Sequence, residues 1–169
     1  MAMEIERKYL IDRPEDTALA RHSVERWEIV QVYLKSEPGV TARVRQVTEG
    51  EKTRYYYTEK RRVSDLTAEE NEREISDLEY MSLFQRADTT LKPIRKCRWR
   101  MPYMGRVLEV DVYPFWKKTA VLEVEFTSES DVADIPEWIN VLKDVTGDVR
   151  FKNVCLACEV PQEESLLCE

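Results

Sequence analysis

The sequence predicts a mainly β fold with a few helices (α+β), arranged as an eight-stranded antiparallel closed β-barrel with a charged lumen. Apolar and polar residues alternate along eight segments, which is the period of β-strands. The turn sequences "SEPGV", "TEGEK" and "PYMG" separate several of these segments and favour short hairpins. About eight strands with only a few helices are typical of a barrel or a strongly curved sheet.

The elements are expected in the following order. The predicted strands cover residues 3–11, 27–35, 41–48, 53–62, 70–76, 93–102, 106–114 and 119–127. Helical patterns cover 14–24, 76–87 and 135–145, and Pro136 suits the first turn of the last of these. "VTGD" then interrupts the chain before a final short element at 150–159.

Length and composition predict one domain spanning 1–169, because no repeat or linker divides the 169 residues. The acidic tail from about residue 160 is expected to be poorly ordered. A net charge of −7 argues against a general nucleic-acid binder. The sequence has no apolar run of about 20 residues and no signal-peptide core, so we expect no membrane association and a soluble, cytoplasmic protein.

The cysteines and the single histidine do not indicate a catalytic or metal site. Cys155 and Cys158 form a lone CxxC without the second pair or nearby histidine that a zinc site requires. We interpret the four cysteines as reduced thiols without a role. His22 is the only histidine, which leaves almost no support for histidine-based triads or metal sites.

Charged side chains recur at i, i+2 on one face of nearly every strand. The sets are Glu4, Glu6 and Lys8; Arg43 and Arg45; Lys60 and Arg62; Glu70, Glu72 and Glu74; Lys96, Arg98 and Arg100; Glu109 and Asp111; Glu123 and Glu125. A solvated sheet face is the simplest interpretation, and its exposed ion pairs would stabilise little. Solvated faces, however, usually mix small polar residues with charges, whereas most of these sets carry one sign.

A barrel with this face inward would bring clustered carboxylates close to clustered basic groups. Two carboxylates about 4 Å apart repel by about 4 kcal/mol at an effective dielectric constant near 20, so several such pairs require cations. Carboxylates without histidine or cysteine suit Mg²⁺ or Mn²⁺. Arginine clusters suit phosphate oxygens. The pattern therefore indicates a lumen matched to a metal-bound polyphosphate.

"EIERK" at the N-terminus resembles the ExExK signature of the triphosphate tunnel metalloenzymes, also called the CYTH superfamily. Its members include class IV adenylyl cyclases, thiamine triphosphatases and inorganic triphosphatases. ExExK alone is a weak motif. The order of later features makes the resemblance specific over nearly the whole chain: Arg43 and Arg45, the Lys60 strand, Lys96 and Arg98, "EVDVY", "LEVEF" and "VTGDVRFKN".

This resemblance implies an active site inside an eight-stranded tunnel. By position, the implied ligands of two Mg²⁺ or Mn²⁺ ions are Glu4, Glu6, Asp111, Glu123 and Glu125. The implied triphosphate-binding cations are Lys8, Arg43, Arg45, Lys60, Lys96, Arg98 and Lys152. Glu4, Glu6, Lys8, Arg43, Arg45, Lys96 and Arg98 are the expected catalytic set. Glu72, Glu74 and Glu109 lie on strands where the family also carries acids. Strand alternation places Arg62 and Arg100 on the same face as the other charged residues.

The leading expectation is a metal-dependent hydrolase of inorganic triphosphate. A class IV adenylyl cyclase, which forms cyclic AMP and pyrophosphate from ATP, is the first alternative, and a nucleoside or thiamine triphosphatase is the second. A polyphosphate-binding module and a sandwich domain with a charged surface are the non-enzymatic alternatives. The expected partner is a small-molecule triphosphate, and a homodimer would help to cover the apolar outer wall.

Overall fold

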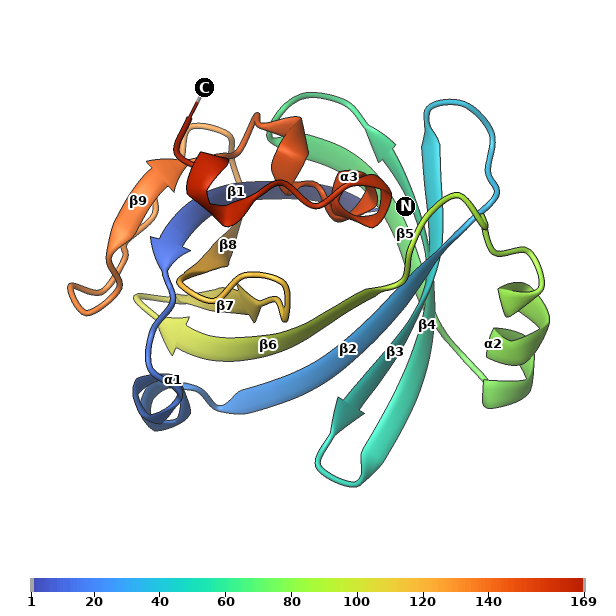
Figure 1. Ribbon diagram of the computed structural model, residues 1–169, viewed down its shortest axis with the longest axis horizontal. Helices are drawn as coiled ribbons and strands as arrows, with labels where there is room; N and C mark the ends of the chain where they lie inside the picture. The colour runs from blue at the N-terminus through green and yellow to red at the C-terminus, as the bar shows by residue number, and fades with distance from the viewer. Residues whose placement is uncertain (1, 169) are drawn as a thin grey trace.

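The computed structural model describes residues 2–168, and its strands form a closed antiparallel barrel (Figure 1). The strand order is β5-β4-β3-β2-β6-β7-β8-β1, and pairing of β5 with β1 closes it. The eight barrel strands are β1 Ala2–Asp12, β2 Glu25–Leu34, β3 Val40–Glu49, β4 Lys52–Arg62, β5 Thr67–Ile75, β6 Ile94–Tyr103, β7 Arg106–Val112 and β8 Thr119–Phe126. The predicted fold class and all eight predicted strands are therefore confirmed.

Three α-helices and two short 3-10 helices accompany the barrel. They are α1 Asp16–His22, α2 Asp77–Phe84, α3 Asn153–Cys158, η1 Val149–Phe151 and η2 Glu163–Ser165. The predicted helices at 14–24 and 76–87 are confirmed, and η1 with α3 forms the predicted element at 150–159. Ser76 explains where α2 begins, because its hydroxyl accepts a hydrogen bond of 3.1 Å from the N–H of Glu79. No helix within residues 2–168 has the length and hydropathy to cross a membrane.

The predicted helix at 135–145 is wrong. Residues 131–140 form an irregular segment, and Val141–Asp144 form a ninth strand, β9, antiparallel to β1. The reason lies in β1, which pairs with β5 only through Ala2–Ile5 and would otherwise expose backbone groups along its second half. The pairs Tyr9↔Asp144 and Leu10↔Lys143 supply partners there, so tertiary pairing overrides the local helical pattern.

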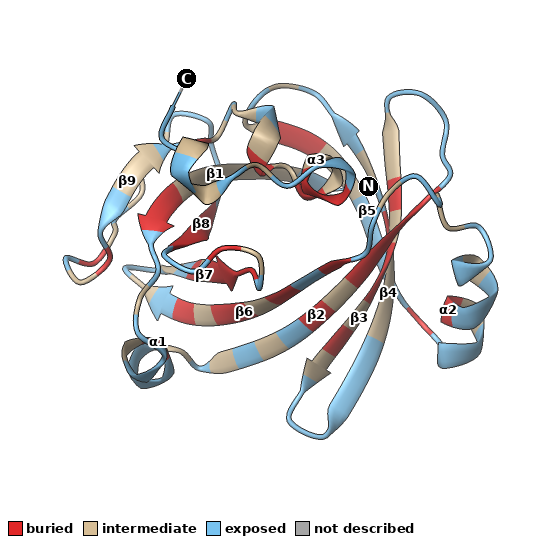
Figure 2. Ribbon diagram, in the orientation of Figure 1, coloured by how far each residue is buried: buried red, intermediate tan, exposed pale blue. Residues whose placement is uncertain are grey.

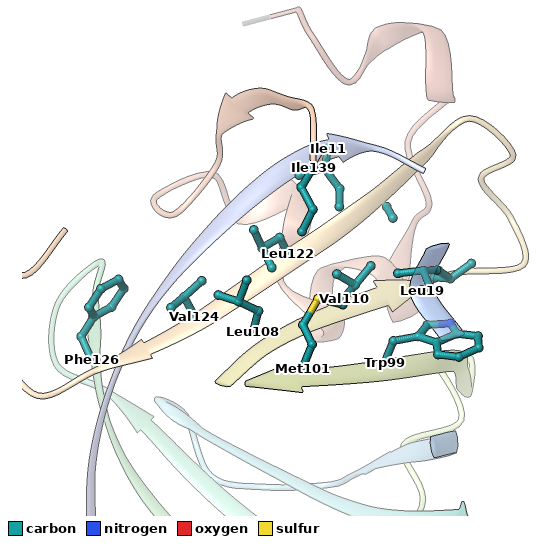
Figure 3. Packing of buried hydrophobic residues seen from close by; sticks show 12 residues of the cluster. Ile11, Leu19, Trp99, Met101, Leu108, Val110, Leu122, Val124, Phe126 and Ile139 are labelled. Carbon is teal, nitrogen blue, oxygen red and sulfur yellow. The ribbon is translucent and has the colours of Figure 1, made fainter. Parts of the chain in front are cut away.

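Two apolar clusters cover the outer wall of the barrel. Side chains of β6, β7 and β8 pack with Leu19 of α1 and with Ile139 of the irregular segment, as Figure 3 shows. On the other side, α2 places Tyr80 against the outer face of β2, β3 and β4. The elements outside the barrel therefore bury much of the apolar outer wall, for which the sequence predicted too few covering helices.

A third apolar cluster fills one end of the lumen. Leu10 and Val121 continue the inward faces of β1 and β8 beyond the charged residues, and side chains from the C-terminal part of the chain pack on them. The cluster consists of Leu10, Tyr33, Ile94, Tyr113, Trp116, Val121, Val145, Phe151, Leu156, Ala157 and Leu166. Burial along the chain is shown in Figure 2.

The acidic tail from about residue 160 contacts the rest of the chain through one apolar residue and one carboxylate. Leu166 is fully buried in the third cluster. The carboxylate of Glu163 accepts hydrogen bonds from the N–H groups of Lys117 at 3.1 Å, Lys118 at 2.6 Å and Thr119 at 2.8 Å. The acidic composition of the tail does not predict these contacts. They depend on one apolar residue and one carboxylate, which hold the tail to the β7–β8 connection.

Candidate functional site in the barrel lumen

The lumen contains two adjoining cavities of about 330 Å³ and 180 Å³. Their linings share Glu4, Glu6, Lys8, Arg43, Lys60 and Asn153, so the two cavities form one charged space. The larger cavity extends past the β4–β5 loop toward Lys152, and the smaller one extends toward Glu109 and Glu125. The lumen is thus large enough for a small polyanion and its counterions.

Strand alternation and register place the charged faces inside this space. Successive side chains point to opposite sides of the wall, and antiparallel pairing aligns the inward residues of neighbouring strands. Lys8 lies opposite Glu123, and Arg98 lies opposite Asp111. Every predicted site residue on β1, β3, β4, β6, β7 and β8 therefore lies on the inward face.

The best-paired charges lie in the wall beside the cavity. Arg98 donates to Asp111 at 2.7 and 2.8 Å and to Glu123 at 2.7 Å, and Lys96 lies 2.5 Å from Asp111. The side chains of Lys96 and Asp111 are completely buried. Burial alone would raise the pKa of the Asp111 carboxyl, but Arg98 and Lys96 hold it below its ordinary value. Burial, with Arg98 nearby, lowers the pKa of Lys96 to about 8.

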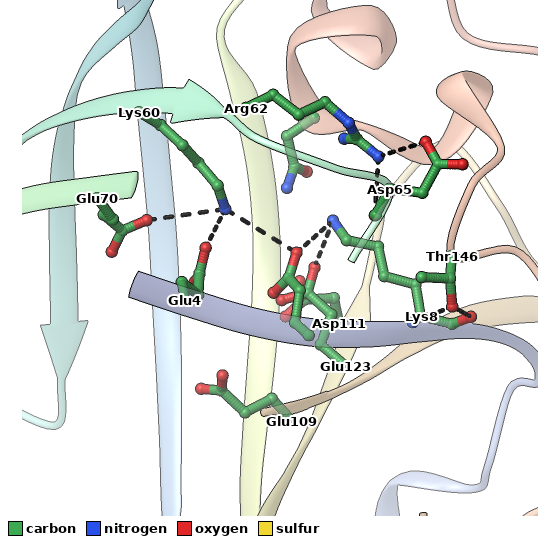
Figure 4. A network of polar contacts seen from close by, with 12 residues as sticks. Glu4, Lys8, Lys60, Arg62, Asp65, Glu70, Glu109, Asp111, Glu123 and Thr146 are labelled. Atoms are coloured by element: carbon green, nitrogen blue, oxygen red, sulfur yellow. Dashed lines mark hydrogen bonds and ion pairs between the residues drawn. The ribbon is translucent and has the colours of Figure 1, made fainter. Parts of the chain in front are cut away.

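Two lysines contact the carboxylates of β1. Lys8 lies 3.1 Å from Glu123 and 3.4 Å from Glu6, and these charges raise its pKa although burial alone would lower it. Lys60 pairs with Glu4 and lies 3.7 Å from Glu70 and 4.0 Å from Glu6. Figure 4 shows the Lys60 ammonium close to Glu4 and the Lys8 ammonium at a separate point of the network, joined to Glu123.

Two arginines of the lumen form no salt bridge with any residue in the described range 2–168. The Nε atoms of Arg43 and Arg45 are buried and have no hydrogen-bond partner within residues 2–168. Arg45 is only 8% exposed. Its burial, together with the positive charges of Arg43 and Arg98, lowers its pKa to about 10. A buried, uncompensated cation facing a cavity is unfavourable unless an anion binds there.

The opposite imbalance occurs where carboxylates face each other. Glu6 lies directly across from Glu125, and Glu109 lies directly across from Glu123. Partial burial, followed by the charges of Glu4 and Glu109, raises the pKa of Glu125. Like charges directly opposite each other are destabilising in a sheet. This side of the lumen therefore favours a bound cation, while Arg43 and Arg45 favour a bound anion.

The predicted residues occupy different parts of this arrangement. Lys152 and Arg62 line the larger cavity, whereas Glu72 and Glu109 line the smaller one. Lys96 and Asp111 are inward and completely buried, and both lie outside the two linings. Glu74 and Arg100 also lie outside both linings, and Arg100 pairs with Glu25 and Glu109.

Sequence reasoning assigned no role to three residues that belong to the site. Glu70 lines the smaller cavity and contacts Lys60, and its i, i+2 relation to Glu72 was a usable signal. Thr58 is fully buried and donates a 2.8 Å hydrogen bond to Glu72. Asn153 accepts a 2.6 Å hydrogen bond from the hydroxyl of Tyr113. Asn153 begins a helix, so strand alternation could not have placed it.

Most carboxylates that the structure describes in the lumen form ion pairs with lysine or arginine, and they do not converge on a common coordination point. Within residues 2–168, no group of three or more histidine, cysteine, aspartate or glutamate side chains is arranged to hold a metal ion as the side chains lie. The four cysteines are free thiols, and Cys155 and Cys158 both lie on α3. Any bound divalent cation must therefore compete with lysine and arginine for oxygen ligands.

No family model matches the chain, and a search of curated proteins also gives no match. Solved structures do match. The inorganic triphosphatase NE1496 is 27% identical, with 96% of this chain and 99% of that chain covered and a TM-score of 0.58.

Two further structures share the fold at lower identity. A conserved hypothetical protein from Pyrococcus furiosus is 22% identical, with 75% of this chain and 80% of that chain covered and a TM-score of 0.57. HpAC1 from Hippeastrum, named as an adenylyl cyclase with a dominant triphosphatase activity, is 16% identical, with 73% and 80% covered and a TM-score of 0.52. At these identities the two structures show the fold alone.

Proposed function

We propose that this chain, which has the fold of the triphosphate tunnel superfamily, is a metal-dependent hydrolase of inorganic triphosphate that releases pyrophosphate and phosphate. One observation supports the proposal most strongly. Arg43 and Arg45, whose buried Nε atoms lack hydrogen-bond partners within residues 2–168, share a cavity with the carboxylates around Glu125. A polyphosphate with bound divalent ions carries the charges that would neutralise both sides.

The basic residues would hold the triphosphate. Arg43 and Arg45 present guanidinium groups, which suit phosphate oxygens, and Lys8 and Lys60 reach the same cavity. Lys152 extends the row toward the larger cavity, where burial and the nearby charge of Arg62 lower its pKa. Arg98 lines the smaller cavity. Lys96 does not line it and would act indirectly, through its ion pair with Asp111.

The carboxylates would hold Mg²⁺ or Mn²⁺, two ions in our proposal. Oxygen donors without histidine or cysteine fit these hard ions, and partial burial together with the charges of Glu4 and Glu109 raises the pKa of Glu125. Glu4, Glu6 and Glu125 are the ligands we favour. Asp111 and Glu123 stay predictions, because both carboxylates now hold the cations Lys96, Arg98 and Lys8. Bound ions would neutralise phosphoryl oxygens and lower the pKa of a bound water.

The chain itself would contribute positioning and electrostatic stabilisation. The cavity linings contain no side chain set up as an activated nucleophile, so we propose direct attack of water on a terminal phosphorus. A new P–O bond would form between water and the terminal phosphorus while the bond from that phosphorus to the bridging oxygen breaks. Pyrophosphate would leave with the bridging oxygen. Cations fixed before the reaction can stabilise the charge that shifts onto the leaving group, which is the main source of rate in phosphoryl transfer.

Product analysis with Mg²⁺ or Mn²⁺ tests the proposal. Inorganic triphosphate and ATP would be supplied separately, and phosphate, pyrophosphate and cyclic AMP would be measured. We expect phosphate and pyrophosphate from triphosphate, and no cyclic AMP from ATP. Glu125→Gln on β8 should remove the activity, and Glu69→Gln on the outward face of β5 should not.

The other outcomes assign other functions. Cyclic AMP with pyrophosphate from ATP would make the protein an adenylyl cyclase. Phosphate release from ATP or thiamine triphosphate, but not from inorganic triphosphate, would make it a triphosphatase of organic substrates. Binding of triphosphate without any product would leave a polyphosphate-binding module.

A further inference from the structure

Lys60 occupies a position that three carboxylates surround. Its ammonium group pairs with Glu4 and lies 3.7 Å from an oxygen of Glu70 and 4.0 Å from an oxygen of Glu6. The carboxylates come from two strands, β1 and β5, that meet where the barrel closes. Figure 4 shows Lys60 reaching from β4 toward Glu4 and Glu70.

Glu70 is the least satisfied of these acids. Its Oε2 atom is buried and forms no hydrogen bond within residues 2–168, although its side chain is 19% exposed. The ammonium of Lys60 is the nearest cation to that oxygen, at a distance longer than a hydrogen bond. The Lys60 ammonium therefore pairs closely only with Glu4, while Glu6 lies nearer to Lys8, at 3.4 Å, and Glu70 has only the distant contact with Lys60.

A second imbalance lies across the same cavity. Arg45, only 8% exposed, lines the smaller cavity with Lys60 and Glu70 and has an unpartnered Nε atom. An anion bound there would attract Lys60 as well as the arginines, because all of these cations line one space. Lys60 thus has two alternative partners, the carboxylates of β1 and β5 or a bound anion.

We infer that Lys60 is an internal cation that competes with a divalent metal ion for Glu4, Glu6 and Glu70, and that Glu70 is a further ligand of that ion. The inference rests on the cation site of the proposed function. The competition has a simple electrostatic basis: an ammonium group and a divalent ion repel each other strongly at a few ångströms. Metal occupancy of these carboxylates therefore requires the Lys60 ammonium to leave them.

Mn²⁺ binding measured by isothermal titration calorimetry, without any phosphate compound, tests the competition. Lys60→Met removes the ammonium and keeps an unbranched side chain. We expect it to lower the dissociation constant for Mn²⁺ at least tenfold. Lys52→Met, at the exposed start of the same strand, is the matched control and should leave the constant unchanged. An unchanged or weaker affinity in Lys60→Met would overturn the inference.

Glu70→Gln tests the second half of the inference and does not depend on whether Lys60→Met folds. Loss of one carboxylate ligand should raise the Mn²⁺ dissociation constant at least fivefold. Glu69→Gln makes the same change on the outward face of β5 and should have no effect. An unchanged constant in Glu70→Gln would exclude Glu70 as a ligand. Neither titration involves turnover, so tighter Mn²⁺ binding in Lys60→Met would support the inference even if triphosphate were not hydrolysed.

Discussion

At the scale of single residues, the lumen contains two kinds of buried charge. Asp111 is completely buried and accepts hydrogen bonds from both Lys96 and Arg98. Arg45 is nearly as buried, yet its Nε atom has no partner within residues 2–168. Paired buried charges fix the structure around them, whereas an unpaired one is unfavourable until a ligand arrives. The two kinds of charge should respond differently to substitution.

Arg45→Gln should reduce activity without reducing stability. A hydrogen bond to a charged group contributes about 1.5–3 kcal/mol, so we expect kcat/KM for triphosphate to fall about 10- to 100-fold. The melting temperature should stay constant or rise, because a buried, unpaired guanidinium is removed. Arg61→Gln on the exposed side of β4 is the control for kinetics and for thermal unfolding. A clear loss of stability in Arg45→Gln would instead indicate a structural role.

Asp111→Asn should have the opposite effect. It leaves Lys96 and Arg98 without their shared carboxylate in a buried position. Breaking a buried ion pair from one side typically costs about 3–5 kcal/mol, so the free energy of unfolding should fall by about that amount. Urea denaturation followed by circular dichroism measures it. A change below 1 kcal/mol would show that Glu123 alone can satisfy Arg98.

At the scale of elements, strand alternation predicts the eight barrel strands, because period two is a local property of the sequence. The segment 135–145 fails as a helix because β1 needs a partner beyond Ile5, and only the closed barrel creates that need. The contacts of the C-terminal tail are also made with residues distant in sequence. Its attachment depends on Leu166 and on the contacts of Glu163 with the β7–β8 connection. A local pattern predicts neither the pairing of β9 nor the contacts of the tail, because both join residues distant in sequence.

The attachment of the tail should depend on pH through Glu163. Partial burial would raise the pKa of this carboxyl, but the N–H groups of Lys118 and Lys117 and the hydroxyl of Thr119 lower it in the folded protein. A group whose pKa is lower in the folded than in the unfolded state stabilises the fold above its unfolded pKa. That stabilisation is lost as the pH falls through the folded pKa.

Glu163→Gln should therefore unfold at lower temperature than the parent at pH 7, and the difference should shrink below about pH 4. Differential scanning calorimetry across pH 3–7 measures both. Glu164→Gln, which alters an exposed neighbour, is the control. A difference that stays constant down to pH 3 would show that the hydrogen bonds of the tail do not depend on the charge of Glu163.

At the scale of the whole molecule, closure of the barrel brings the charged i, i+2 residues of its strands together in one lumen. Sequence alternation predicts which residues of each strand face inward, and Glu6, Lys8, Arg43 and Arg98 all line the lumen as expected. It does not predict which charges pair and which stay unpartnered, because that depends on register and on depth in the wall. Lys96 and Arg98 are two residues apart, yet Lys96 is completely buried next to Asp111 and Tyr113 and only Arg98 lines the cavity.

The balance of charge over the whole lumen predicts how a metal should affect stability. A ligand that binds only the folded state stabilises it by about 2.7 kcal/mol at 100 times its dissociation constant. For a chain of this size, that corresponds to a rise in melting temperature of about 5–10 °C. Mn²⁺ should produce this rise by neutralising the carboxylates that face each other, such as Glu6 and Glu125. Glu125→Gln should require much more Mn²⁺ for the same rise, whereas Glu69→Gln should behave like the parent. An equal Mn²⁺ response in all three proteins would exclude Glu125 as a ligand of the stabilising ion.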